Sequence, residues 1–176
     1  MRGVIGVAAA ALVGIVLIAA PSGSGATSAR PMLYFLGNSG RTLVPAVRVS
    51  APETPHAALA ALVAGPNAAE QAEGEKSALP AATRVNGIKV QAAVATVDFG
   101  GPGLTPLRTI PRLRVIASVT YTLTSFPTIK TVRFTLNGRP WGVYNHAGRV
   151  IRDYRRGTLA HPWLSACAPG DGCFAP

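Results

Sequence analysis

The chain has 176 residues, of which 48% are hydrophobic, and its formal net charge is +10 at pH 7. This length suits one domain with a sizeable core. Three His, seven acidic residues and two Cys leave few groups for catalysis, so the composition points away from an acid–base or metal-dependent enzyme.

The N-terminus has the pattern of an export signal. A short basic start is followed by the uncharged apolar run 3–20 and by small polar residues up to Ala29. We expect cleavage after Ala26, so that residues 1–26 are a signal peptide and 27–30 a linker. The alternative is an uncleaved N-terminal membrane anchor, because the apolar run is at the lower edge of what spans a bilayer. Both readings place the domain outside the cytoplasm.

The first elements read as a hairpin followed by a helix. Residues 32–36 and 43–49 are rich in apolar side chains and flank a Gly-Asn-Ser-Gly turn. Pro45 in the second strand indicates an edge position or a bulge. Thr54 can cap a helix that starts at Pro55 and ends at Gly65-Pro66. The polar residues 71–77 are expected to be exposed.

The middle of the chain predicts a strand pair and a second helix. Residues 83–90 and 93–99 read as paired strands that turn at Gln91-Ala92, with an uncertain register. Residues 115–123 are rich in β-branched side chains, which favour a strand. The spacing of Ile116, Val119 and Leu123 is helical, so we predict a helix between the flanking prolines 111 and 127.

The last elements are a strand over 131–136, a turn at Asn137-Gly138 and a hairpin formed by 141–144 and 149–151. After Tyr154 the chain is expected to be loop-like.

This order of a capped helix, a proline-bounded loop, a strand pair, a second helix and a strand resembles the GerMN domain. That domain is a small extracytoplasmic module of Gram-positive bacteria, found in spore-germination proteins and in the actinobacterial lipoprotein LpqB. The segments that carry the resemblance are ALAALVAGP (58–66), SALP (77–80), VATVDF (94–99), YTLTSFP (121–127) and VRFTLNG (132–138).

The resemblance covers residues 31–154 and implies an α+β fold. Two helices pack on one face of a mixed, mostly antiparallel sheet, similar to ring-building motifs. It implies no catalytic residues and no cofactor, and a link to sporulation, germination or envelope signalling.

Residues 155–176 form a basic and aromatic tail in this reading. Cys167 and Cys173 flank a Pro-Gly-Asp-Gly turn, and in an exported chain this pattern predicts a disulfide. A metal site is the weaker alternative, because no paired His lies near the two thiols.

Positive charge is concentrated after Gly100, where ten basic residues face only Asp153 and Asp171. Aromatic rings stack on sugars and Arg pairs with carboxylate or phosphate, so the aromatic and basic residues there are a candidate interaction surface. Trp141 and Tyr154 are expected to belong to the core instead. The candidate residues are Arg139, Tyr144, Arg149, Arg152, Arg155, Arg156 and Trp163.

The sequence therefore predicts a non-enzymatic module that binds an anionic envelope component, either a wall polymer or a lipid headgroup, or an extracytoplasmic protein domain. Nucleic acid is not an expected partner of an exported chain. The alternative function is a cell-wall-modifying hydrolase or an inhibitor of one, which would need Asp98 or His146 to be buried beside another titratable group. Asp98 at a strand end is more simply a structural hydrogen-bond acceptor.

Overall fold

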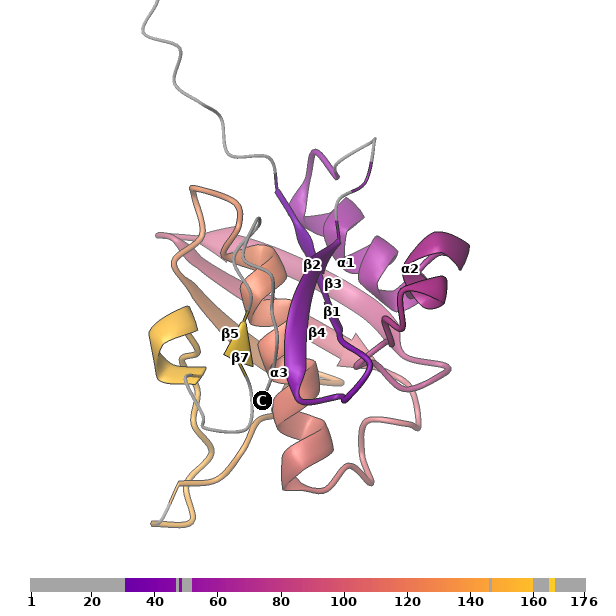
Figure 1. The fold of residues 1–176 in the computed structure, drawn as a ribbon. Coiled ribbons are helices and arrows are strands. Elements are labelled where there is room, and N and C mark those ends of the chain that lie inside the picture. The colour runs from indigo at the N-terminus through magenta and orange to yellow at the C-terminus, as the bar shows by residue number, and fades with distance from the viewer. Residues whose placement is uncertain (1–30, 47, 49–51, 146, 160–164, 167–176) are drawn as a thin grey trace, which may run out of the picture.

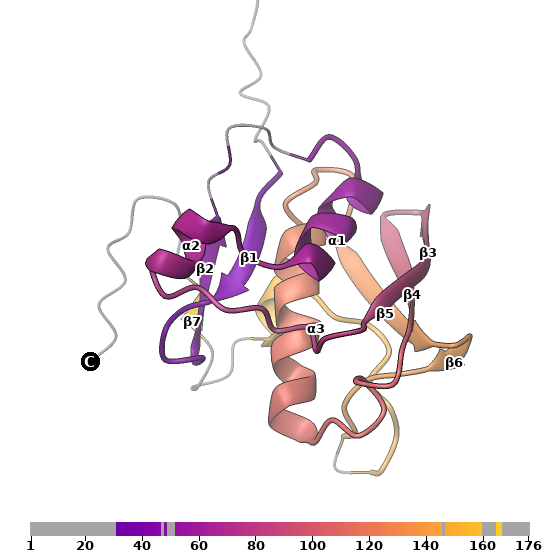
Figure 2. The ribbon, with the colours of Figure 1, turned by 90° about the vertical axis from the view of Figure 1, so that its right-hand side faces the viewer.

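The computed structural model describes residues 31–46, 48, 52–145, 147–159 and 165–166. These residues form three layers, in which helices lie between a small sheet and a larger one (Figures 1 and 2). The strands are Leu33–Leu36 (β1), Thr42–Ala46 (β2), Arg84–Gln91 (β3), Val94–Gly100 (β4), Thr131–Leu136 (β5), Arg139–Pro140 (β6) and Ser165–Ala166 (β7). The helices are Pro55–Ala64 (α1), Ala68–Ala72 (α2), Thr109–Leu123 (α3) and the 3-10 turn Arg156–Leu159 (η1).

The larger sheet has the order β3-β4-β5-β6. β3 and β4 form an antiparallel pair, β5 runs parallel to β4 after the crossover through α3, and β6 returns antiparallel to β5. Along β4, Ala95, Val97 and Phe99 are buried, while the residues between them are partly exposed. The three buried side chains face the helices. The pairing of β3 with β4 supplies the register that the sequence left open.

Helix α1 has the ends that the sequence predicts. The Thr54 side chain accepts a hydrogen bond from the Ala57 amide at 3.1 Å, and Pro55 is the first helical residue. Gly65 follows the last turn with a φ of +85°, a conformation that glycine adopts without strain. Leu59 and Leu62 are fully buried.

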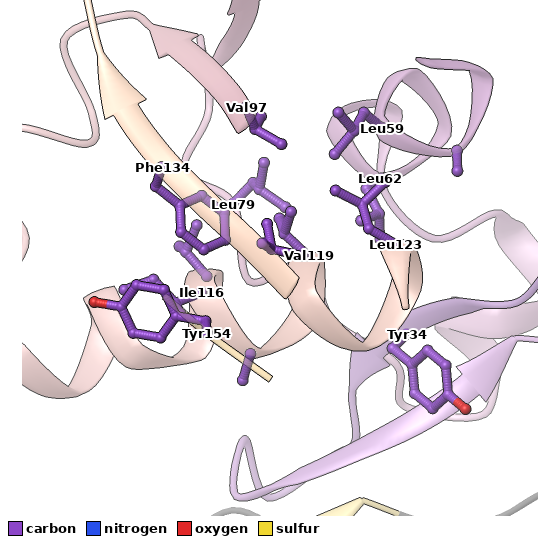
Figure 3. Close-up of a cluster of buried hydrophobic side chains, with 14 of the residues drawn as sticks. Tyr34, Leu59, Leu62, Leu79, Val97, Ile116, Val119, Leu123, Phe134 and Tyr154 are labelled. Carbon is purple, nitrogen blue, oxygen red and sulfur yellow. The ribbon is translucent and has the colours of Figure 1, made fainter. Parts of the chain in front are cut away.

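Segment 109–123 is a helix despite its β-branched residues, as its spacing predicts. It starts two residues before Pro111, which the first turn of a helix tolerates because that turn needs no amide donor. Ile116, Val119 and Leu123 are fully buried against α1 and the larger sheet (Figure 3). Tertiary packing therefore outweighs the strand propensity of the side chains.

The edge of β1 that faces away from β2 bonds side chains of α3 and of the residues just after it. Ser118 donates to the Tyr34 carbonyl at 2.6 Å, and Thr122 accepts from the Tyr34 amide at 3.0 Å. Ser125 accepts from the Met32 amide at 2.9 Å. Ser118 and Thr122 lie one turn apart on α3 and Ser125 lies just beyond its end, so three hydroxyls satisfy a strand edge that is largely buried.

The α+β class predicted from the sequence is confirmed, with one difference in architecture. The first hairpin does not join the larger sheet: β1, β2 and β7 form a sheet of their own, in which β7 pairs in parallel with Thr42 and Leu43. Helices α1 and α3 consequently pack between the two sheets (Figure 2).

The turn between β3 and β4 lies one residue later than predicted, at Ala92-Ala93. Both alanines have positive φ angles, +48° and +62°. Such a two-residue turn matches the twist of a hairpin, but it is normally built from Asn and Gly, so alanine gives no sequence signal for it.

Replacing Ala92 with Asn and Ala93 with Gly should stabilise the protein by about 1 kcal/mol, because it relieves the left-handed strain of two side chains. Urea unfolding of both proteins measures the difference. As a control, Ala69→Gly in the ordinary helical conformation of α2 should lower stability. A lower midpoint for the turn variant would show that the two alanines are not strained.

The packed domain continues beyond Tyr154, contrary to the loop-like end that the sequence suggested. Residues 156–159 form η1, which contacts α3, and Leu159 is buried. The basic tail of the sequence reading therefore begins inside the fold.

Candidate interaction surface

The predicted last hairpin is present and carries two of the candidate residues. Tyr144 and Val150 form an antiparallel bridge, and the Asn145 side chain accepts hydrogen bonds from the amides of Ala147 and Arg149. The Tyr144 side chain is 63% exposed, and Arg149 is also exposed. The hairpin thus presents an aromatic ring and a cation to solvent.

The base of this hairpin is fixed to the core through Tyr154. The Tyr154 hydroxyl accepts a hydrogen bond from the Val143 amide at 3.0 Å. A Cβ on Gly142 would lie 2.4 Å from the same hydroxyl, so only glycine fits there. Arg112 of α3 donates to the Gly142 carbonyl at 3.1 Å and lies over the Trp141 ring.

Trp141 and Tyr154 are core residues, as expected. Both are buried, and their rings pack edge-on against Phe134 of β5 with centroid separations of 6.2 and 5.5 Å. Burial raises the pKa of Tyr154, although the hydrogen bond from Val143 opposes the shift. Neither ring is available for a ligand.

The remaining candidate residues have different surroundings in the fold. Arg139 of β6 and Arg152 are exposed. Arg155 is also exposed, and its Nε donates to the Thr131 hydroxyl at 3.0 Å beside β5. Trp163 lies outside the described residues, as do Cys167 and Cys173 with their predicted disulfide.

Arg156 is not the exposed tail residue that the sequence reading assumed. Its guanidinium lies 5.3 and 5.1 Å from the ring centroids of Tyr34 and Tyr121. It also donates to the Thr124 hydroxyl and the Tyr121 carbonyl, each at 2.9 Å. These contacts tie η1 to α3 and β1, so Arg156 has a structural role.

A buried acidic cluster that sequence reasoning missed lies next to α2. Glu70 accepts two hydrogen bonds from Arg48, both at 2.8 Å, and a third from the Asn67 amide. The hydrogen bonds from Arg48 hold the pKa of Glu70 below its ordinary value, despite burial. Only the spacing of Asn67 and Glu70, which form a capping box at the start of α2, is visible in the sequence.

Glu75 is the second member of this cluster, and it corrects the expectation that residues 71–77 are exposed. Backbone hydrogen bonds between Lys76 and Leu36 hold the segment against β1, which leaves Glu75 only 7% exposed. Its Oε2 has no hydrogen-bond partner among the described residues. Burial, followed by the charges of Glu70 and Glu73, raises the pKa of Glu75 to about 7.

Asp98 has the structural role that its strand-end position suggested. Its carboxylate accepts hydrogen bonds from the Thr135 hydroxyl, from the Gly138 amide at 2.8 Å and from the Asn86 side chain at 2.9 Å. Burial alone would raise the pKa of Asp98, but these donors outweigh it and lower the pKa. The described partners include no titratable group. His146 lies outside the described residues.

Two further findings concern metals and membranes. No group of three or more potential metal ligands occurs within residues 31–46, 52–145 and 147–159 or the other described positions. Of the helices that the structure describes, none is long and apolar enough to cross a bilayer.

The helix–strand–strand–helix–strand order of α1, β3, β4, α3 and β5, with its hairpin and basic surface, defines a small α+β module without an evident catalytic centre among the residues described. The sequence profile of the Germane family, described as "Sporulation and spore germination", matches residues 32–141. The chain belongs to this family, which confirms the resemblance seen in the sequence.

Solved structures agree with this assignment. The chain is similar to the first GerMN domain of the sporulation protein GerM from Bacillus subtilis, with 25% identity and a TM-score of 0.56, covering 72% of this chain and 96% of that domain. It matches the tandem GerMN domains of the same protein with equal identity and TM-score, covering 46% of that longer chain. A search of curated proteins finds no match.

Proposed function

We propose that this protein is a non-enzymatic, extracytoplasmic interaction module that associates with the cell envelope in a process linked to sporulation, germination or envelope signalling. Its family supports the biological setting. The apolar and basic pattern of residues 1–26 supports the location, as a signal peptide or an N-terminal anchor.

The observation that carries the proposal is the exposed basic surface. Arg139, Arg149, Arg152 and Arg155 are all exposed, and so is Tyr144, which shares the hairpin with Arg149. Such a surface favours an anionic envelope component, a wall polymer or a lipid headgroup, over an apolar partner. An acidic extracytoplasmic protein domain is the other partner that this surface suits.

The alternative, a cell-wall hydrolase or an inhibitor of one, has less support. A hydrolase would use a carboxyl group next to a second titratable group at a cleft, and the three described donors to Asp98 leave it in a structural network.

Retention of the mature domain on isolated envelope preparations should fall steeply as the salt concentration rises, because exposed charges are screened over about 8 Å at physiological ionic strength. Changing Arg149 and Arg152 to Gln should weaken retention further without lowering the melting temperature, since both side chains are exposed.

The matched control changes Arg41 and Arg84, which are exposed on other elements, to Gln. This pair removes the same charge and should have less effect on retention. Arg48 is unsuitable as a control because it is paired with Glu70. Retention that is insensitive to salt, or equal losses in both pairs, would contradict a specific role of the hairpin surface.

A further inference from the structure

One face of the larger sheet has no described element packed on it. The helices lie against the opposite face, as Figure 2 shows from the side. The uncovered side chains on β3, β4 and β5, and on the segment that follows the hairpin, form what we call the open sheet face. Its residues are Lys89, Gln91, Val94, Thr96, Arg133, Asp153 and Arg155. Thr131 shares this face but is only 5% exposed.

The strand register places cations on both sides of a central threonine. Lys89 on β3 lies opposite Thr96 on β4, and Thr96 lies opposite Arg133 on β5. Two strand spacings separate the backbones of Lys89 and Arg133, about 10 Å in total. Two long side chains can therefore converge on one group above Thr96.

The same register continues to the segment that follows the hairpin. Tyr154 pairs with Val132, so its neighbours on each side point to the open face. Asp153 accepts a hydrogen bond from the Arg133 Nε, and Arg155 bonds Thr131 in the next row. Asp153 orients Arg133 through its Nε. The two terminal nitrogens of the guanidinium are not used in this hydrogen bond and can donate to a ligand.

A hollow of about 260 Å³ lies at this place on the sheet. Val94 and Thr96 of the central strand form its base, Lys89 and the turn residues lie on one side, and Arg133 lies on the other. Lys89 and Arg133 are exposed, and the described part of the chain offers Lys89 no ion-pair partner.

The donors around this hollow match a phosphoryl group. The Lys89 ammonium, the terminal Arg133 nitrogens and the Thr96 hydroxyl come from three strands and approach from different sides. A phosphodiester is tetrahedral at phosphorus and keeps two anionic oxygens, so an Arg and a Lys on opposite sides of the hollow can each donate to one of them.

We propose that the open sheet face binds a phosphodiester-bearing anionic chain and seats one phosphoryl group above Thr96, between Lys89 and Arg133. This proposal rests on the proposed function. It names the chemistry of the partner and places the binding site on the open sheet face, apart from the hairpin. A soluble chain is the occupant, because the side chains that line the hollow are mostly polar or charged, and its one large apolar residue, Val94, is partly buried and unsuited to insertion into a bilayer.

The test is binding of poly(glycerol phosphate) to the folded domain by calorimetry, with vesicles of phosphatidylglycerol as the second arm. Changing both Lys89 and Arg133 to Gln should weaken binding of the polymer about tenfold. Thr96→Val removes one hydroxyl without changing charge and should weaken binding about threefold. Thermal melts of each variant check that the fold is retained.

The charge-matched control changes Arg41 and Arg108 to Gln, two exposed cations that belong neither to the hollow nor to the hairpin surface, and should bind the polymer nearly as well as the parent. Equal losses in the two double variants, or normal binding by Thr96→Val, would overturn the site. Binding to vesicles but not to the polymer would overturn the proposed occupant. If the polymer does not bind while envelope retention persists, the sheet-face proposal fails and the proposed function stands.

Discussion

Replacing Ile116 with Asp should abolish the cooperative thermal melt of the domain. Ile116 is fully buried on the face of α3 that packs against the larger sheet (Figure 3), so a carboxylate there would be removed from water. Burying a charge and losing the packed side chain together cost more than about 4 kcal/mol, a large part of the stability of a small domain.

The matched control is Ile110→Asp on the same helix. Ile110 is 50% exposed and lies in the first turn of α3, where a negative charge interacts favourably with the helix dipole. Circular dichroism should show a melt close to that of the parent. If Ile116→Asp also melts within a few degrees of the parent, the inward face of α3 has been assigned incorrectly.

Replacing Glu75 with Gln should make the protein more stable at pH 8 and leave its stability near pH 5 almost unchanged. The pKa of Glu75 is raised to about 7 in the folded protein, from an ordinary value of 4.5. Between these two values the folded state holds a proton that the unfolded state has released. Stability therefore falls as the pH rises through this range, by up to about 3 kcal/mol, and glutamine removes that loss.

Urea unfolding between pH 5 and pH 8 measures this difference. Glu53→Gln is the control, because Glu53 is exposed and is not among the charges that raise the pKa of Glu75, while its replacement makes the same change in charge. Its stability should follow the parent's pH dependence closely. Parallel curves for the parent and Glu75→Gln would show that Glu75 is ionised in the folded protein at neutral pH.

Much of the fold follows from local patterns, and α1 and α3 show why. The cap at Thr54 and the stop at Gly65 act within a few residues, so they are visible in the sequence. The spacing of Ile116, Val119 and Leu123 identifies a helix because the same periodicity places these side chains on one buried face.

The features that could not be predicted depend on residues far apart in the chain. Nothing near Arg156 in sequence indicates that Tyr34 and Tyr121 hold it. Glu75 stands in a polar run, and only its attachment to β1 buries it. The cations of the open sheet face come from β3 and β5, whose neighbours are set by the strand order rather than by sequence proximity.

The hydroxyl contacts of α3 with β1 have a consequence for how the chain folds. The Met32 amide bonds a side chain 93 residues away, and the Tyr34 carbonyl and amide bond side chains 84 and 88 residues away. A chain synthesised from its N-terminus releases β1 long before α3 exists. The earliest strand must therefore wait, with its second edge unpaired, until most of the domain has been made. Such distant contacts slow folding, so completion of α3 should be the step that secures the first hairpin.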